Sequence, residues 1–394
     1  MSANDVFDVL VVGSGASGLA AAVSAHRAGA RVAVATKGSI QACNSAKAQG
    51  GIQAALGPED SPERHAEDIW RSSHETADLR LVEVLTTEAP SAIHWLEELG
   101  VAFTKENGGY RLARCGGASA KRLLQVGDRT GHAITKALRE VVESSEIAVF
   151  PNSPLRELEE GWVARVGERT VRATTVVLGA GGRCFAEAAE RGELSTNHPG
   201  ATGEVTSIAL DAGAEARDLD ALQYHPNGGA WPPSMQGYSI PETTRAYGAV
   251  LLNADGEEFT DSLGPRDVVS QAIVDEVAKG KGVDTPDGRP AVYLDTTRIA
   301  EHDAELSLPY MLRRYRGAGI DPLTEKILTY PVLHYQNGGL VIDTSAETTV
   351  EGLYACGEIA GGTHGRNRMM GNSLLECVVF GRRAGRAAAE KARA

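Results

Sequence analysis

Metal-type cysteine spacing, aromatic side chains and long apolar runs are all scarce in this chain of 394 residues. Its five cysteines are scattered, odd in number and never spaced as CxxC. They are Cys43, Cys115, Cys184, Cys356 and Cys377. A disulfide framework, a zinc site, an iron–sulfur cluster and a c-type haem site each need a spacing that is missing here. We therefore expect free thiols, no metal and a reducing compartment.

Membrane and nucleic-acid partners are also disfavoured. No apolar run approaches the ~20 residues that a membrane helix needs, and "MSANDVFDVL" lacks the basic and apolar regions of a signal peptide. The formal net charge is -13, from 39 Lys+Arg against 52 Asp+Glu, which repels nucleic acid. Apolar residues make up 42% of the chain, enough for a large core. We expect a cytoplasmic protein of one long domain or two.

The clearest local pattern lies at the N-terminus. Residues Phe7–Val12 predict a buried strand, Ala16–Arg27 a helix and Arg31–Ala35 a second strand, which together make a βαβ unit. The turn between strand and helix reads Gly13-x-Gly15-x-x-Gly18. These glycines permit a tight turn and the close approach of a pyrophosphate at the helix N-terminus. We therefore predict a dinucleotide site of the Rossmann type.

Three further features qualify this prediction. The second strand ends at Thr36, where an acidic residue normally binds the adenosine ribose. Ala173–Arg183 predicts a strand that runs into a glycine-rich turn at Ala180 and Gly181, and we interpret it as another wall of the first site rather than a second nucleotide site. Between Ala221 and Tyr330 proline and glycine become more frequent, which indicates an inserted domain.

Several ordered segments resemble the fumarate reductase/succinate dehydrogenase flavoprotein family, which includes L-aspartate oxidase. They are "AKAQGGI", "GDRTGHAITKALR", "QYHPNG", "ETTRAYGAVLLNADGEEF", "PRDVVSQAI", "HYQNGG", "GLYACGE" and "HGRNRMMGNSLLE". The resemblance covers nearly the whole chain. It implies an α/β fold in which a Rossmann-like FAD-binding domain, residues 1–220 and 331–394, carries an inserted α+β capping domain, residues 221–330.

Two departures from the family concern the cofactor and partners. Covalent members attach the flavin through a histidine at the position of Asn44, so we expect non-covalent FAD. Larger members continue into a helical domain after the flavin domain, whereas this chain stops at Ala394. We therefore expect a short soluble member, and a docking face for an iron–sulfur subunit is in doubt.

The resemblance also assigns a substrate site. Arg368 matches the arginine that binds a substrate carboxylate, for which a planar guanidinium is well suited. His225 and His334 match two substrate-binding histidines. Arg266 matches the proton donor, with Glu242 and Arg245 as its relay. An arginine acid is unusual because its pKa exceeds ~12, so it requires coupling to such a relay.

Two substrate positions differ from the family. Pro241 stands where the family has a threonine that donates its hydroxyl to the distal carboxylate, and proline offers no donor. Cys115 stands where L-aspartate oxidase has a glutamate for the amino group, although it could also simply fill space. A neutral thiol does not pair with an ammonium. Both changes suggest a substrate that differs from fumarate and aspartate.

The remaining matching positions belong to FAD. We expect the cofactor to contact Gly13, Gly15, Ala16, Ser17, Gly18, Thr36, Lys37, Ser45, Gln49, Gly50, Gly51, Ala180, Gly181, Glu358, Ser373 and Leu374. Ser373 and Leu374 begin a helix that extends to the chain end, and its dipole favours the anionic reduced flavin. His364 is a further candidate near the flavin, whereas Arg366 is interpreted as structural.

Three functions remain open at this level. The first is an FAD-dependent oxidoreductase that interconverts a saturated C–C bond and a C=C bond beside a carboxylate, with a small carboxylic acid as substrate. The second is an amino-acid oxidase of the L-aspartate oxidase type, which "GIDPLTEKI" favours and Cys115 disfavours. The third is a flavin electron-transfer subunit without its own substrate. The sequence specifies neither reaction direction, electron partner nor oligomeric state.

Overall fold

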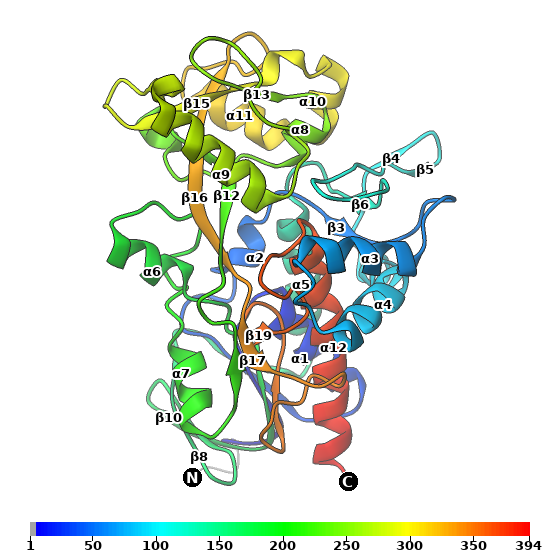
Figure 1. Ribbon diagram of the computed structural model, residues 1–394. Helices are drawn as coiled ribbons and strands as arrows, with labels where there is room; N and C mark the ends of the chain where they lie inside the picture. Colours follow the sequence, from blue (N-terminus) through cyan, green and yellow to red (C-terminus); the bar gives the residue numbers. More distant parts are fainter. Residues whose placement is uncertain (1–4) are drawn as a thin grey trace.

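The computed structural model describes residues 5–394. It has two lobes, a lower one that contains the chain's C-terminus and an upper one built from the middle of the chain (Figure 1). The main hydrophobic core draws on residues 7–214 and 340–389, and a second core draws on residues 235–327. This split agrees with an inserted capping domain, and we retain the division into residues 1–220, 221–330 and 331–394 as a proposal.

A seven-stranded sheet forms the centre of the lower lobe. Its strand order is β7-β2-β1-β10-β9-β8, and β18 also pairs with β10. Strands β7, β2, β1, β10 and β18 run parallel, whereas β9 and β8 are antiparallel additions. The strands are β1 (Val6–Val12), β2 (Val32–Ala35), β7 (Ala148–Phe150), β8 (Leu155–Glu159), β9 (Val163–Val166), β10 (Arg169–Leu178) and β18 (Leu353–Ala355).

The register of this sheet creates the site. Val12 lies opposite both Ala35 and Leu178, and Leu178 lies opposite Ala355. The carboxyl ends of four parallel strands therefore meet at one edge, which is where ligands bind in open α/β sheets. The predicted βαβ unit is confirmed, with α1 at Ala16–Arg27.

Helix α12 (Asn372–Ala392) packs along α1 (Figure 1). Gly381 and Gly385 make this approach possible, because a Cβ added to them would lie 2.6 Å from the Ser17 carbonyl and 2.1 Å from the Ala21 carbonyl. The close packing brings the N-terminal end of α12 to the same sheet edge as the glycine-rich turn.

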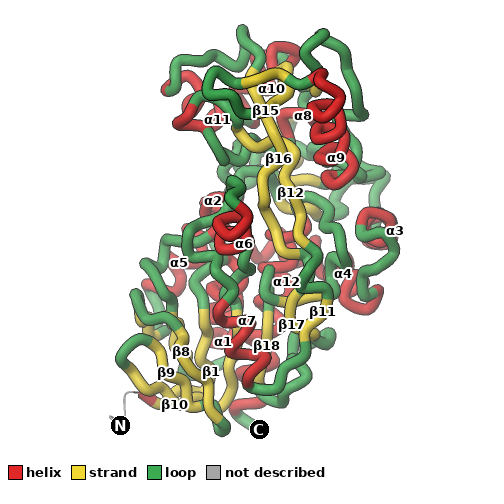
Figure 2. Tube along the Cα trace, turned by 60° about the vertical axis from the view of Figure 1, so that its left-hand side comes forward, coloured by secondary structure: helices red, strands yellow, loops and turns green. Residues whose placement is uncertain are grey.

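The upper lobe contains a five-stranded sheet of order β12-β16-β15-β13, with β14 paired to β15. Two of its strands are long and run between the lobes (Figure 2). The strands are β12 (Leu222–Gly229), β13 (Val250–Leu252), β14 (Val283–Asp284), β15 (Pro290–Asp295) and β16 (Ile327–Gln336). Its helices are α8 (Thr243–Ala246), α9 (Arg266–Glu276), α10 (Glu301–Ser307) and α11 (Pro309–Gly317).

The other elements surround the junction of the lobes and the lower sheet. The helices are α2 (Asn44–Lys47), α3 (Pro62–Ser72), α4 (Leu79–Glu98), α5 (Thr130–Glu143), α6 (Cys184–Arg191) and α7 (Glu204–Asp211). Short strands pair as β3 (Ile52–Gln53) with β6 (Leu123–Leu124), β4 (Lys105–Glu106) with β5 (Gly109–Tyr110), and β17 (Gly339–Val341) with β11 (Ala216–Arg217) and β19 (Ala360–Gly361). Within residues 5–394, none of the helices has the length and apolarity that crossing a membrane requires.

Candidate active site

The glycine-rich turn after β1 has the geometry of a dinucleotide cradle. Gly13 has φ +111°, and a Cβ there would lie 2.2 Å from the Gly179 carbonyl oxygen. Gly18 packs against the same turn, since its Cβ would lie 2.1 Å from the Gly13 carbonyl oxygen. The main-chain N–H of Ala16 donates to Ser45 Oγ at 3.1 Å. Both glycines are therefore required by close backbone contacts, and the helix N-terminus faces the cavity described next.

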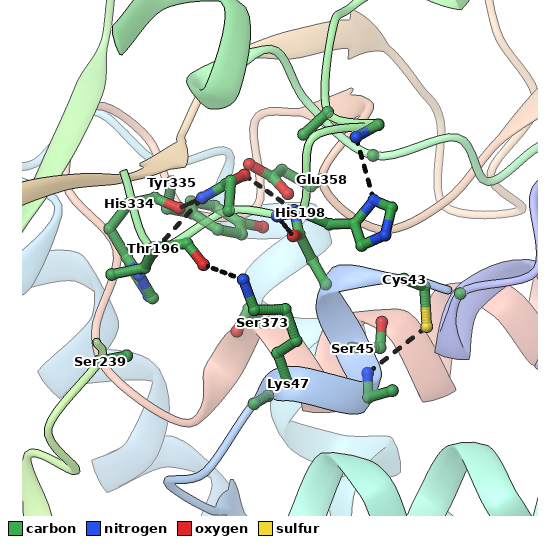
Figure 3. Close-up of a pocket in the computed structure, with 18 of the residues that line it drawn as sticks. Cys43, Ser45, Lys47, Thr196, His198, Ser239, His334, Tyr335, Glu358 and Ser373 are labelled. Carbon is green, nitrogen blue, oxygen red and sulfur yellow. Dashed lines mark hydrogen bonds between the residues drawn. The ribbon is translucent and has the colours of Figure 1, made fainter. Parts of the chain in front are cut away.

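A cavity of about 1040 Å³ extends from this cradle to the junction of the lobes. It brings together most of the predicted cofactor residues: Gly13, Gly15, Ser17, Thr36, Lys37, Ser45, Gln49, Gly50, Gly51, Ala180, Gly181, Glu358, Ser373 and Leu374. Figure 3 shows several of them around one space. Ala16 and Gly18 support the turn from behind and do not line the cavity. One cavity thus serves both glycine-rich turns, as the interpretation of Ala180 and Gly181 as a second wall requires.

The end of β2 carries a hydroxyl and a lysine in place of the usual acid. Ser14 Oγ donates to Thr36 Oγ1 at 2.9 Å, and Lys37 forms an ion pair with Glu204. Glu204 begins α7 after Gly203, which has φ +78°. Sequence reasoning missed this acidic residue because it lies far along the chain from the turn it faces. It returns a carboxylate to the part of the cavity where β2 lacks one.

Glu358 lies deep in the cavity wall. Its Oε1 accepts the main-chain N–H of Gln336 at 3.0 Å. Burial raises the pKa of its carboxyl to about 7. A carboxyl that shares the cavity with the N-terminal end of α12 is well placed to accept hydrogen bonds from cofactor hydroxyl groups.

The junction of the lobes holds the predicted substrate residues. His225, His334, Arg266, Arg368, Glu242 and Pro241 all line the same cavity, whereas Arg245 lies behind it. The rings of His225 and His334 meet edge to face, 4.9 Å apart. The guanidinium of Arg368 lies 4.3 Å from the centre of the Tyr335 ring. The structure therefore joins side chains from β12, β16, α9 and the segment before α12.

Charge at this end is concentrated around one carboxylate. Arg266 Nε donates to Glu242 Oε2 at 2.6 Å, and Arg245 Nη2 lies 3.4 Å from the same oxygen. Burial raises the pKa of Glu242, but the two guanidinium groups outweigh it and lower the pKa below its ordinary value. The main-chain N–H of Gly116 donates to the other oxygen at 3.1 Å. Glu242 is therefore ionised and shared by the two arginines.

Burial also changes the substrate-facing groups. It lowers the pKa values of His225 and His334 well below the ordinary value, and the nearby Arg266 lowers both further. It lowers the pKa of Arg368 to about 10. At neutral pH the site thus contains two neutral imidazoles and a charged Arg368. The Nε atom of Arg368 has no hydrogen-bond partner among the residues that the structure describes.

Gln223 is a further residue of this site that the sequence analysis missed. Its Oε1 accepts from Arg368 Nη2 at 3.0 Å and from Arg266 Nη1 at 3.4 Å. Its Nε2 donates to Asn367 Oδ1 and to the Arg368 carbonyl, each at 2.8 Å. One amide therefore fixes the spacing of the two arginines. Its place in "QYHPNG", two residues before His225, was the signal that could have found it.

Cys115 and Pro241 have different positions. Cys115 is buried outside the cavity lining, where its Sγ accepts from Gln53 Nε2 at 3.3 Å and donates to the Met370 carbonyl at 3.6 Å. Burial raises the pKa of this thiol to about 12. These contacts favour the space-filling interpretation of Cys115. Pro241 does line the cavity, so the loss of a hydroxyl at this position affects the site directly.

His364 and Arg366 lie outside the cavity lining. His364 Nε2 pairs with Glu376 Oε2 at 2.8 Å, so the structure does not place His364 against the flavin-binding space. Arg366 forms ion pairs with Asp218 and Asp220, which supports its structural interpretation. Of the three basic residues in this segment, only Arg368 lines the cavity.

Comparison with known proteins decides the family. A model of the FAD binding domain family matches residues 8–374. The chain belongs to this family. The glycine cradle, the cavity size and the helix end at Ser373 are what FAD requires, so the described residues fit the cofactor. Expected contacts of individual residues with FAD remain proposals.

The flavoprotein is similar to several characterised proteins. It is 35% identical to the flavin-family chain of the CoM/CoB fumarate reductase of Methanothermobacter marburgensis, over 98% of this chain and 73% of the relative. It is 37% identical to L-aspartate oxidase of Streptomyces coelicolor over 95% and 67%. A chain of E. coli quinol fumarate reductase superposes with a TM-score of 0.89 at 30% identity, over 98% and 70%. The flavoprotein is therefore an FAD-dependent oxidoreductase of the fumarate reductase/succinate dehydrogenase type.

Proposed function

We propose that this flavoprotein interconverts a saturated C–C bond and a C=C bond next to a carboxylate. The observation that carries the proposal is the arrangement of Arg266 and Arg368. Both guanidinium groups are buried, line the flavin-binding cavity and are bridged by Gln223. Two buried cations facing one cavity require an anion and can stabilise negative charge that develops beside it.

Arg368 is the proposed clamp for the substrate carboxylate. Its pKa of about 10 leaves it charged at neutral pH. Its free Nε offers a donor beside the Nη groups, which suits two-point binding of a planar carboxylate. Gln223 and the Tyr335 ring hold the guanidinium in place. His225 and His334 would donate to further substrate oxygens.

Arg266 is the proposed proton donor. FAD, when bound, accepts or donates the hydride of the reaction. Arg266 would then deliver or remove the proton at the adjacent carbon. Its Nε is paired with Glu242, which is itself shared with Arg245. This buried chain of charges provides a route by which a proton returns to Arg266 after turnover.

Amino-acid oxidation is the second candidate, because an L-aspartate oxidase is among the relatives at 37% identity. An ammonium group would need a free carboxylate beside Arg368. The acids among the described cavity residues are Glu204, Glu242 and Glu358, and each is already engaged by Lys37, Arg266 or the Gln336 N–H. This engagement favours the carbon–carbon reaction.

A panel of assays on the FAD-loaded protein distinguishes the candidates. Oxidation of reduced viologen by unsaturated acids, or reduction of a dye by saturated acids, supports the proposal. Peroxide release from L-aspartate or another amino acid supports the oxidase instead. If neither acids nor amino acids react or perturb the flavin spectrum, the electron-transfer interpretation gains support and the proposal is wrong.

Variants test the assignment of the acid. Arg266→Gln should lower turnover by about 10²–10⁴-fold, the usual range for a general acid, with FAD still bound. Arg366→Gln is the matched control, because Arg366 lies outside the cavity and pairs with surface aspartates. Near-normal turnover in Arg266→Gln would remove Arg266 from the acid role.

Non-covalent binding of FAD is part of the proposal. Asn44 lies in the cavity wall, and its side chain is engaged: Nδ2 donates to Asn197 Oδ1 at 2.8 Å, and Oδ1 accepts the His198 N–H at 2.6 Å. An amide provides no nucleophilic nitrogen for a bond to the flavin. Acid or heat should therefore release the yellow chromophore from the protein completely.

A further inference from the structure

The two histidines of the substrate site are each held at the Nδ1 atom. The main-chain N–H of Asn227 lies 2.9 Å from His225 Nδ1. Thr196 Oγ1 lies 2.6 Å from His334 Nδ1. In a neutral imidazole one ring nitrogen carries the proton and the other accepts, so these contacts decide which nitrogen faces the substrate as a donor.

For His225 the assignment follows directly. A main-chain N–H can only donate, so His225 Nδ1 must be the acceptor. His225 is buried and neutral, and its single ring proton therefore lies on Nε2.

For His334 the neighbours of the hydroxyl decide. The hydrogen-bond partners of Thr196 Oγ1 within residues 5–394 are His334 Nδ1 and Asn197 Nδ2, the latter at 3.5 Å. Asn197 Nδ2 is a donor, and so the hydroxyl proton has only His334 Nδ1 as an acceptor. The neutral ring of His334 consequently carries its proton on Nε2, as His225 does.

The position of Thr196 is set by pairing with β16. Its N–H donates to the Leu333 carbonyl at 3.1 Å, and Lys47 Nζ donates to its own carbonyl at 2.7 Å (Figure 3). Asn197 Nδ2 donates to the His334 carbonyl at 2.6 Å. Contacts before and after the hydroxyl therefore hold it against the imidazole, and Thr196 is only 8% exposed.

We propose that Thr196 is a positioning residue that holds His334 as the neutral Nε2–H tautomer and so makes the histidine pair a matched set of donors. The inference rests on the proposed function for its consequence. Two Nε2–H groups beside Arg368 recognise carboxylate or carbonyl oxygens. They offer no acceptor to an ammonium group, and so they select a substrate without an amino group at this end of the cavity.

The first test measures the tautomer and is independent of turnover. FAD-loaded protein labelled with ¹⁵N-histidine is studied by two-bond ¹H–¹⁵N correlation spectra at neutral pH, and signals are assigned with His225→Gln and His334→Gln. The expected result is an unprotonated Nδ1 in both rings of the wild type and of Thr196→Ser. In Thr196→Val, the Nδ1–H form of His334 should appear while His225 is unchanged. A wild-type His334 that is protonated at Nδ1 would overturn the proposal.

The second test measures ligand binding through the flavin absorbance, with malonate as a dicarboxylate probe. Thr196→Val should weaken binding by about tenfold, the effect of losing one well-placed hydrogen bond, and Thr196→Ser should restore it. Thr296→Val is the matched control, since its buried hydroxyl bonds the Pro322 carbonyl in the upper lobe. Equal weakening in both valine variants would overturn the positioning role. Failure of malonate to bind the wild type would count against the proposed function, while the tautomer spectra would still decide the inference.

Discussion

Acidification should weaken the fold through His65, a buried histidine outside the proposed catalytic set. His65 lies on α3, and its Nε2 is 2.9 Å from Oδ1 of Asn372, the first residue of α12. Burial lowers its pKa to about 4, and the cationic Arg122 contributes in the same direction. The neighbouring Asp60 and Asp68 raise it but do not compensate. Protonation of His65 is therefore resisted in the folded state.

The sign and size of the effect follow from linkage. The pKa is about 4 when folded and 6.5 as the unperturbed value, so the unfolded chain takes up the proton first as the pH falls. The stabilisation is fully present above about pH 6.5 and is lost as the pH falls towards 4. A shift of about 2.5 units at ~1.36 kcal/mol per unit corresponds to about 3 kcal/mol.

Urea unfolding of the wild type and His65→Gln at pH 7.5 and pH 4.5 tests this reasoning. The free energy of unfolding should fall between these pH values by about 2–3 kcal/mol more in the wild type than in the variant. A uniform offset caused by the substitution cancels in this comparison. His302→Gln, which changes an exposed histidine, is the control and should follow the wild type. Parallel pH profiles for wild type and His65→Gln would refute the argument.

Three further predictions concern the cradle, the cavity wall and a buried ion pair. Gly13→Ala should abolish retention of FAD through purification, because its Cβ would lie 2.2 Å from the Gly179 carbonyl oxygen; a yellow variant would contradict this. Without FAD, the raised pKa of Glu358, about 7, should make the melting temperature fall as the pH rises from 4.5 to 7, because the folded state then binds more protons; Glu358→Gln should remove that slope, and an unchanged slope would argue against it. Arg122→Met should cost about 3–5 kcal/mol in urea unfolding, because two buried aspartates lose their partner; a loss below about 1 kcal/mol would be inconsistent with an uncompensated buried charge.

Local patterns predicted the parts of the site that depend on neighbours in sequence. The βαβ unit and its glycine turn follow from periodicity and spacing over residues 7–35, and the structure confirms them. The family motifs predicted that Arg266 and Arg368 belong to one site, and the structure places both in the same cavity wall. Their catalytic roles stay predictions.

Contacts between distant segments were not visible in the same way. Glu204 faces Lys37 across 167 residues of chain, and Thr196 meets His334 across 138. Neither pair has a spacing rule, because β-strand register and packing bring the segments together rather than local geometry. Cys115 illustrates the opposite error: its motif position suggested the substrate pocket, yet packing places its side chain outside the cavity lining.

The sequence by itself determined the cofactor class and the main charges of the proposed chemistry, because a glycine turn before a helix and the ordered family motifs are properties of short segments. Tertiary structure alone decided the protonation pattern. Burial makes His225 and His334 neutral, and Gln223, Thr196 and the Asn227 N–H orient the groups around them. Burial and hydrogen-bond direction depend on residues that only the folded chain brings within a few ångströms.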